Sequence, residues 1–162
     1  MSEYKIITAP IELNFLLFVN KIYDKTWVTD ISCESFYHDF EDRLERLWNK
    51  RVDSLFTKKS YVLNEGLVEE DIKELVANEK IGETVVKEFK NLWGWDSLPP
   101  YGYGSLIERV CGSLRIEQMN RIVGVDTIHI MITFDAIPTR YKREIPEDKL
   151  KILPYMEFLK YV

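Results

Sequence analysis

Ile128-His129-Ile130-Met131-Ile132-Thr133-Phe134-Asp135 is the stretch that decides the fold class of this chain. Isoleucine or phenylalanine occupies every second position, and a period of two is typical of a β-strand with one buried face. An earlier segment alternates in the same way through Leu114 and Ile116, and Gly124 lies between the two segments. We therefore expect an antiparallel hairpin over residues 113–136.

Upstream of this hairpin the apolar residues recur at spacings of three and four, which indicates helices. In a predicted helix over residues 11–24 they surround the axis, so we expect it to be mostly buried. The longest predicted helix, residues 33–57, has one apolar stripe, made of Phe36, Phe40, Leu44, Leu47, Trp48, Val52 and Leu55. Two shorter helices are expected over residues 68–79 and 83–93, and Gly82 is expected to separate them.

The ends and the connections complete the predicted architecture. Residues 4–8 read as a short edge strand or an ordered arm, and residues 152–162 are expected to pack back onto the body. Residues 94–104 contain two prolines and three glycines, which exclude regular structure there. The expected fold is α+β, with a mainly helical N-terminal two-thirds followed by a small antiparallel sheet. We expect one globular domain over residues 1–162.

The charge balance excludes one class of function. The chain has 27 acidic and 22 basic residues and a formal net charge of -5. Proteins that bind nucleic acids directly carry a basic surplus that neutralises phosphates. This chain lacks that surplus, so we expect no direct nucleic-acid binding. An acidic protein instead attracts basic partners, mainly by raising the rate of association.

The cysteines and the apolar runs bear on the compartment. Cys33 and Cys111 are too few for a disulfide framework and read as free buried thiols, which favours the cytoplasm. The N-terminal residues contain no basic region followed by a long apolar stretch, so a secretory signal is not expected. The longest apolar run, Phe15 to Val19, is too short to cross a bilayer. We expect a cytoplasmic protein with no membrane association.

Residues of the kind that catalyse reactions or bind metals do not form a recognisable signature. His38 and His129 are far apart in the sequence, and neither has a second histidine close by. Cys33 has no well-placed base beside it, as a cysteine nucleophile needs. Glu88-Phe89-Lys90 has the letters of a metal-nuclease pair but lies within a helix pattern. We therefore expect a protein that is not an enzyme and holds no metal or cofactor.

Acidic residues gather at the start of two predicted helices. The first cluster is Asp30, Glu34, Asp39, Glu41 and Asp42, and the second is Glu65, Glu69, Glu70 and Asp71. In one interpretation they complement the helix dipoles and form solvated faces. In the other they form a negative patch that docks a cationic partner. For that patch the candidate contact residues are Asp30, Glu34, Asp39 and Asp42.

The aromatic loop, residues 93–103, is the second candidate contact surface. Trp and Tyr are enriched where binding energy concentrates, and prolines reduce the ordering that binding requires. The candidate contacts are Trp95, Asp96, Tyr101 and Tyr103. Two arrangements stay open. Either the loop packs Trp93 and Trp95 onto the core, or only Trp93 points inward and the others face outward.

A small, acidic, aromatic-rich chain without a catalytic set resembles the bacterial immunity proteins, such as those of contact-dependent inhibition systems. The resemblance is one of overall character, carried by the acidic balance and by stretches such as Trp27-Val28-Thr29-Asp30 and Trp95-Asp96. It implies a protein that binds and blocks a cognate toxin, often a basic nuclease, with acids that mimic phosphates and cover the toxin's active cleft.

Two other functions stay open on the sequence. One is a small cytosolic enzyme with an unrecognised pocket, using Asp135 or His129 near the hairpin and Tyr101 or Tyr103 from the loop. The other is a subunit or adaptor of a cytosolic assembly.

Overall fold

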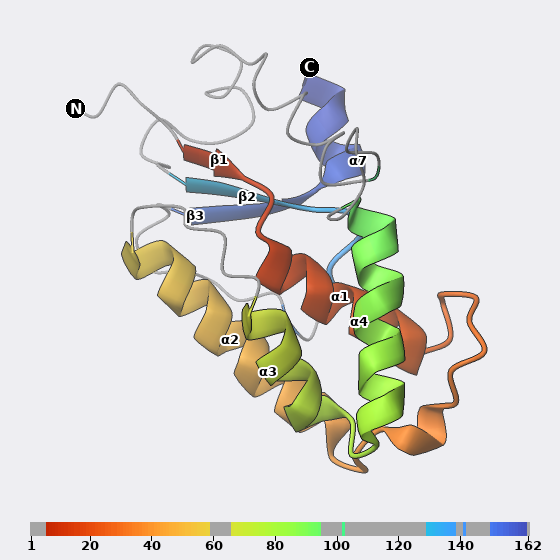
Figure 1. The fold of residues 1–162 in the computed structure, drawn as a ribbon. Coiled ribbons are helices and arrows are strands. Elements are labelled where there is room, and N and C mark those ends of the chain that lie inside the picture. Colours follow the sequence, from red (N-terminus) through yellow and green to blue (C-terminus); the bar gives the residue numbers. More distant parts are fainter. Residues whose placement is uncertain are drawn as a thin grey trace.

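The computed structural model describes residues 6–58, 66–94, 102, 129–138, 141 and 150–161. In chain order its elements are β1 (Ile6–Thr8), α1 (Ile11–Tyr23), the 3₁₀ turn η1 (Cys33–Ser35), α2 (Phe40–Lys58), α3 (Gly66–Leu75), α4 (Glu79–Trp93), β2 (His129–Thr133), β3 (Leu150–Pro154), α7 (Tyr155–Phe158) and the 3₁₀ turn η3 (Leu159–Tyr161). Figure 1 shows the sheet at one end of the molecule and helices α1 to α3 beneath it. The α+β class and the helical N-terminal part are therefore confirmed.

The sheet is parallel throughout, so the predicted antiparallel hairpin over residues 113–136 is wrong. Strand β2 lies between β1 and β3, with Ile7 opposite Ile130 and Met131 opposite Ile152. Both hydrogen-bonding edges of β2 are occupied by parallel neighbours, and no edge is left for an antiparallel partner. The predicted first strand of the hairpin lies in residues 113–128, outside the described residues. A period of two identifies a strand but does not identify its neighbours.

Strand β2 is covered on both faces, whereas the alternating pattern predicted one buried face. Ile130 and Ile132 are 0% exposed, and so are Met131 and Thr133 on the opposite face. Central strands of parallel sheets are usually covered on both sides. Thr133 tolerates this burial because its hydroxyl donates to the carbonyl of Asp135 over 2.8 Å.

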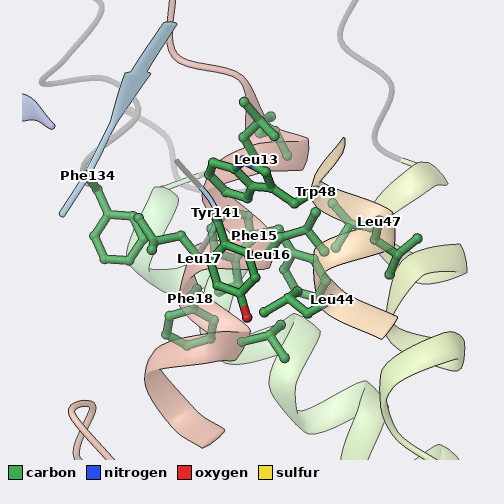
Figure 2. Packing of buried hydrophobic residues seen from close by; sticks show 14 of the residues in the cluster. Leu13, Phe15, Leu16, Leu17, Phe18, Leu44, Leu47, Trp48, Phe134 and Tyr141 are labelled. Atoms are coloured by element: carbon green, nitrogen blue, oxygen red, sulfur yellow. The ribbon is translucent and has the colours of Figure 1, made fainter. Parts of the chain in front are cut away.

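Helix α1 is the centre of the core. All ten residues from Ile11 to Asn20 are buried, as the apolar residues around its axis predicted. The helix packs against α2, α3, α4 and β2. Phe15 meets Phe89 of α4 edge to face, with 5.2 Å between the ring centres. Figure 2 shows the apolar side chains of α1 between β2 and α2.

One buried amide joins α1 to the end of β2. The Nδ2 of Asn14 donates to the carbonyl of Ile132 over 3.0 Å and to that of Pro10 over 2.8 Å. Its Oδ1 accepts a hydrogen bond of 2.8 Å from the backbone N–H of Phe134. Asn14 is 0% exposed. Its side chain therefore takes the place of a backbone partner for β2 at the point where the strand ends.

The predicted α-helix does not begin at residue 33: residues 33–35 form the short 3₁₀ helix η1, and the residues between it and α2 are not helical. Phe36 forms an antiparallel bridge with Val76, and the N–H of Tyr37 donates to the carbonyl of Leu75 over 3.1 Å. Phe36 is buried, as expected, but through this bridge and not as part of a helix face. Helix α2 begins at Phe40, after the segment has crossed the end of α3.

The break between α3 and α4 lies at residues 76–78, not at Gly82 as predicted. Asn78 caps α4, because its side-chain oxygen accepts from the N–H groups of Lys80 over 3.0 Å and Ile81 over 3.2 Å. Gly82 lies inside the helix. At the other end Trp93 is buried, as predicted, and Gly94 ends the helix in the left-handed conformation with φ 80°.

Asp135 follows β2 and forms an ion pair with Lys21 of α1. Burial opposes ionisation of Asp135. The hydrogen bond from Lys21, the N–H of Ala136 and the charge of Lys21 together outweigh burial and hold the pKa of Asp135 below 3.8, the ordinary value. The folded state therefore binds a proton less readily than the unfolded chain, so this pair stabilises the fold above pH 3.8 and loses its effect as the pH falls through the lowered pKa.

Replacing Asp135 with Asn is expected to lower the free energy of unfolding by about 0.5–1 kcal/mol at pH 7, because the carboxylate is 46% exposed and partly screened by water. The difference from the wild type should shrink in acid. Urea titrations of both proteins from pH 7 to pH 2.5 measure it. Lys21→Gln should show the same pH dependence, and a difference that stays constant down to pH 2.5 would contradict the assignment.

Candidate functional site

The acidic face consists of the loop of residues 24–32, η1 and the first residues of α2. Over residues 24–42 six acids stand against one lysine. Asp30, Glu34 and Asp42, three of the predicted contact residues, are exposed. Figure 1 shows this part of the chain, in orange, at the end of the molecule away from the sheet. These three predicted acids lie within one stretch of chain and are all accessible to solvent.

Asp39, the fourth predicted acid, also has an internal role. Its carboxylate accepts a hydrogen bond of 2.7 Å from Nε of Arg43, which lowers the pKa of Asp39. Nη1 of Arg43 donates to the carbonyl of Glu74 over 3.1 Å, and the guanidinium carbon lies 4.1 Å from the ring centre of Tyr37. Asp39 and Arg43 therefore fasten the start of α2 to the end of α3.

Val28 is the residue of the acidic face that sequence reasoning missed. It is 100% exposed, although both of its neighbours are anchored. Trp27 packs edge to face on Phe18 with 5.3 Å between the ring centres, and the hydroxyl of Thr29 donates to the carboxylate of Glu88 over 3.1 Å. The two anchors hold an apolar side chain outward beside Asp30. No periodic pattern in the sequence signals this exposure.

A groove of about 870 Å³ between α3 and α4 adjoins the acidic face. Pockets that hold ligands usually have volumes of about 300–1,000 Å³. The buried residues Ile72, Val76, Gly82 and Val86 form its floor. The walls and rim consist of Tyr37, Glu69, Lys73, Ala77, Asn78, Glu79, Glu83, Lys87, Lys90 and Asn91. An apolar floor under a charged rim suits a polypeptide segment with both kinds of side chain.

The groove has a negative and a positive end on α4. Glu79 and Glu83 line it in the first two turns of the helix, and Lys87 and Lys90 line it in the last two. Lys90 also lies 3.8 Å from Glu69 of α3. The negative end meets the acidic face, because the N–H of Ala77 donates to the carbonyl of Ser35 over 3.3 Å.

The predicted aromatic contacts Trp95, Asp96, Tyr101 and Tyr103 lie outside the described residues, so their role stays a prediction. Trp93, at the start of that loop, stacks on Phe89 with 5.7 Å between the ring centres.

Asp71, from the second acidic cluster, does not belong to a solvated face. It is 1% exposed and forms an ion pair with Arg51 of α2. Glu69, from the same cluster, is exposed and lines the groove. Glu65 lies outside the described residues. Of the residues that were considered for an enzyme, Asp135 pairs with Lys21 and does not line the groove.

Within the described ranges no three His, Cys, Asp or Glu side chains lie close enough to hold a metal ion. Of the helices that the structure describes, none has the length and apolar character needed to cross a membrane.

Comparison of the chain with protein-family models, with curated proteins and with solved structures finds no match in any of the three. The acidic face and the groove are therefore the features on which a function can be argued.

Proposed function

We propose that this chain is a non-catalytic protein-binding protein of the immunity type, which binds a basic toxin domain and blocks it. The observation that carries this proposal is the acidic face, where six acids stand against one lysine over residues 24–42. A surface with an excess of negative charge attracts a positively charged partner and raises the rate at which the two associate.

The exposed Val28 supports the same proposal. Tight interfaces depend on a few anchor residues that become buried, surrounded by polar and charged contacts. Val28 is fully exposed, lies two residues before Asp30 in the chain, and is held between the anchored residues Trp27 and Thr29. Because the loop is already held, binding orders fewer groups, which favours affinity.

The test is co-expression with the protein encoded by the neighbouring gene. We expect a one-to-one complex in size-exclusion chromatography, and we expect the partner's toxicity to disappear when this chain is present. Recovery of this chain alone, with a neighbour that stays toxic or is not basic, would overturn the proposal.

Neutralising the acidic face should slow association without unfolding the protein. In the triple variant Asp30→Asn, Glu34→Gln and Asp42→Asn, all three side chains are exposed, so we expect an unchanged melting temperature. The association rate constant should fall about tenfold at low salt, and its salt dependence should weaken. Stopped-flow or surface plasmon resonance measures both.

The matched control removes the same number of charges elsewhere, through Asp53→Asn, Glu70→Gln and Glu157→Gln, all of them exposed. Equal slowing by the two triple variants would show that only net charge matters and would contradict a specific acidic face.

A further inference from the structure

We propose that the groove between α3 and α4 receives a segment of the same basic partner. The cationic side chains of that segment would lie at the end with Glu79 and Glu83, and one of its apolar side chains would lie over Gly82. This inference rests on the proposed function and specifies where on this chain a segment of the partner binds and in which orientation.

Gly82 is the first observation. It is buried inside α4 and lines the floor of the groove. Among the described residues a Cβ placed there would meet only the side chain of Ile72, at 3.5 and 3.7 Å, which is ordinary van der Waals contact. The described packing therefore does not require glycine, although glycine within a helix costs about 0.5–1 kcal/mol relative to alanine. A glycine lets a ligand approach the helix backbone more closely than a residue with a side chain does.

The surroundings of Gly82 are the second observation. Ile72, Val76 and Val86 are 6%, 4% and 7% exposed, so the floor around Gly82 is apolar and well packed. An apolar side chain of the partner would bury these groups further. Recognition of a partner segment in an apolar groove commonly works through such anchors.

The order of charges selects the orientation of the segment. Along α4, from the acidic face into the groove, a bound segment passes Glu79, then Gly82 and Glu83, then Val86, and then Lys87 and Lys90. Lys73 of α3 lines the same groove. Complementarity to the α4 side of the groove requires cationic side chains near Glu79 and Glu83, an apolar side chain at Gly82 and Val86, and acidic side chains near Lys87 and Lys90. The cationic side chains near Glu79 and Glu83 would belong to the same basic partner that residues 24–42 attract.

The negative end of the groove, where it meets the acidic face, is already formed in the free protein. Tyr37 lines it, and its backbone N–H is bound to the carbonyl of Leu75. Arg43 lies over its ring and also binds Asp39, which fixes the aromatic side chain in place. A preformed wall reduces the ordering cost of binding.

The test uses the complex with the protein encoded by the neighbouring gene. Gly82→Leu adds a side chain at the floor of the groove, beside Ile72. Thr84→Leu adds the same side chain to an exposed position of α4 that does not line the groove. We expect Gly82→Leu to weaken affinity about tenfold or more, as loss of a central anchor does, and Thr84→Leu to leave it within about twofold. Equal affinity of the two variants would overturn the inference.

Glu83→Lys provides a second variant that does not depend on packing, because Glu83 is exposed. It should weaken affinity several-fold more than the control Glu157→Lys on α7, where the same charge change lies outside the groove. Melting curves of each free variant establish that it is folded.

The results separate the two proposals. If the triple variant of the acidic face weakens binding while Gly82→Leu and Glu83→Lys do not, the proposal that the partner binds in the groove is wrong and the proposed function stands. If the wild-type chain forms no complex with the basic neighbour, both are wrong.

Discussion

Replacing Asp71 with Asn is expected to lower the free energy of unfolding by about 3–5 kcal/mol, because it leaves a guanidinium buried without its counter-charge. Arg51 is 7% exposed and Asp71 is 1% exposed. Nε of Arg51 donates to Oδ2 of Asp71 over 3.0 Å, and Nη2 donates to Oδ1, so both carboxylate oxygens are used.

The electrostatics of this pair follow from its burial. Desolvation raises the pKa of Asp71, and the hydrogen bonds from Arg51 oppose that rise. The hydrogen bond to Asp71, with the charges of Asp71, Glu12 and Glu70, raises the pKa of Arg51. The two shifts differ in what they indicate: the raised pKa of Arg51 reflects the attraction of the pair, and the raised pKa of Asp71 reflects the cost of burying its charge. The buried guanidinium is therefore tolerated only as long as the carboxylate is present.

Urea titrations of single and double variants measure the coupling. Arg51→Met and Asp71→Leu should each be strongly destabilising, and the double variant should lose less than the sum of the two, by about 0.5–3 kcal/mol. Arg51→Lys should recover only part of the loss, because an ammonium group cannot match the two-point geometry. Additive losses, or a single loss under about 1 kcal/mol, would show that the pair is not coupled as the structure indicates.

Replacing Asn14 with Leu is expected to cost about 2–6 kcal/mol. The substitution leaves the carbonyl of Ile132 and the N–H of Phe134 buried without the partner they have in the wild type, and each such group costs about 1–3 kcal/mol. The carbonyl of Pro10 keeps the backbone N–H of residue 14 as a donor, at 3.1 Å. Loss of this link should loosen the end of β2, and faster amide exchange at Phe134 would report it.

Asn14→Asp gives a pH-dependent form of the same test. One carboxylate oxygen can still accept the hydrogen bond from the N–H of Phe134. The other would face the carbonyls of Pro10 and Ile132, to which Nδ2 of Asn14 donates in the wild type. Such a carboxyl titrates at a raised pKa in the folded state, so the variant should regain stability as the pH falls through that value. The control is Asn20→Ala, since the hydrogen bonds of Asn20 are long, at 3.4 Å. Equal losses for Asn14→Leu and Asn20→Ala would contradict the role of Asn14.

Local patterns predicted part of the candidate site. The acids of residues 24–42 are close together in the chain, and the structure gives all of them except Asp39 as exposed. The groove could not be predicted, because it depends on where α3 ends and α4 begins. The sequence pattern predicts the break at Gly82, but the backbone of residues 76–77 is bound by residues 35–37, and this long-range contact places the break there.

Burial separated acids that look alike in the sequence. Glu69 and Asp71 belong to one cluster, yet Glu69 is exposed on the rim of the groove and Asp71 is buried against Arg51. The partner of Asp71 lies 20 positions away in the chain, and no local pattern identifies it. In the same way, the exposure of Val28 follows from anchors on α1 and α4.

The spacing of apolar residues was sufficient for the kind of the four long helices and of β2, since helix and strand periods are set by the geometry of the backbone within a few residues. It did not predict the strand β3. It was sufficient for the buried α1, for the apolar stripe of α2 and for the strand β2. The neighbours of β2 were settled by the folded chain, because strands β1 and β3 come from opposite ends of the sequence and occupy both of its edges. Hydrogen bonding between strands depends on which segments meet in space, and a local period carries no information about segments that lie a hundred residues apart.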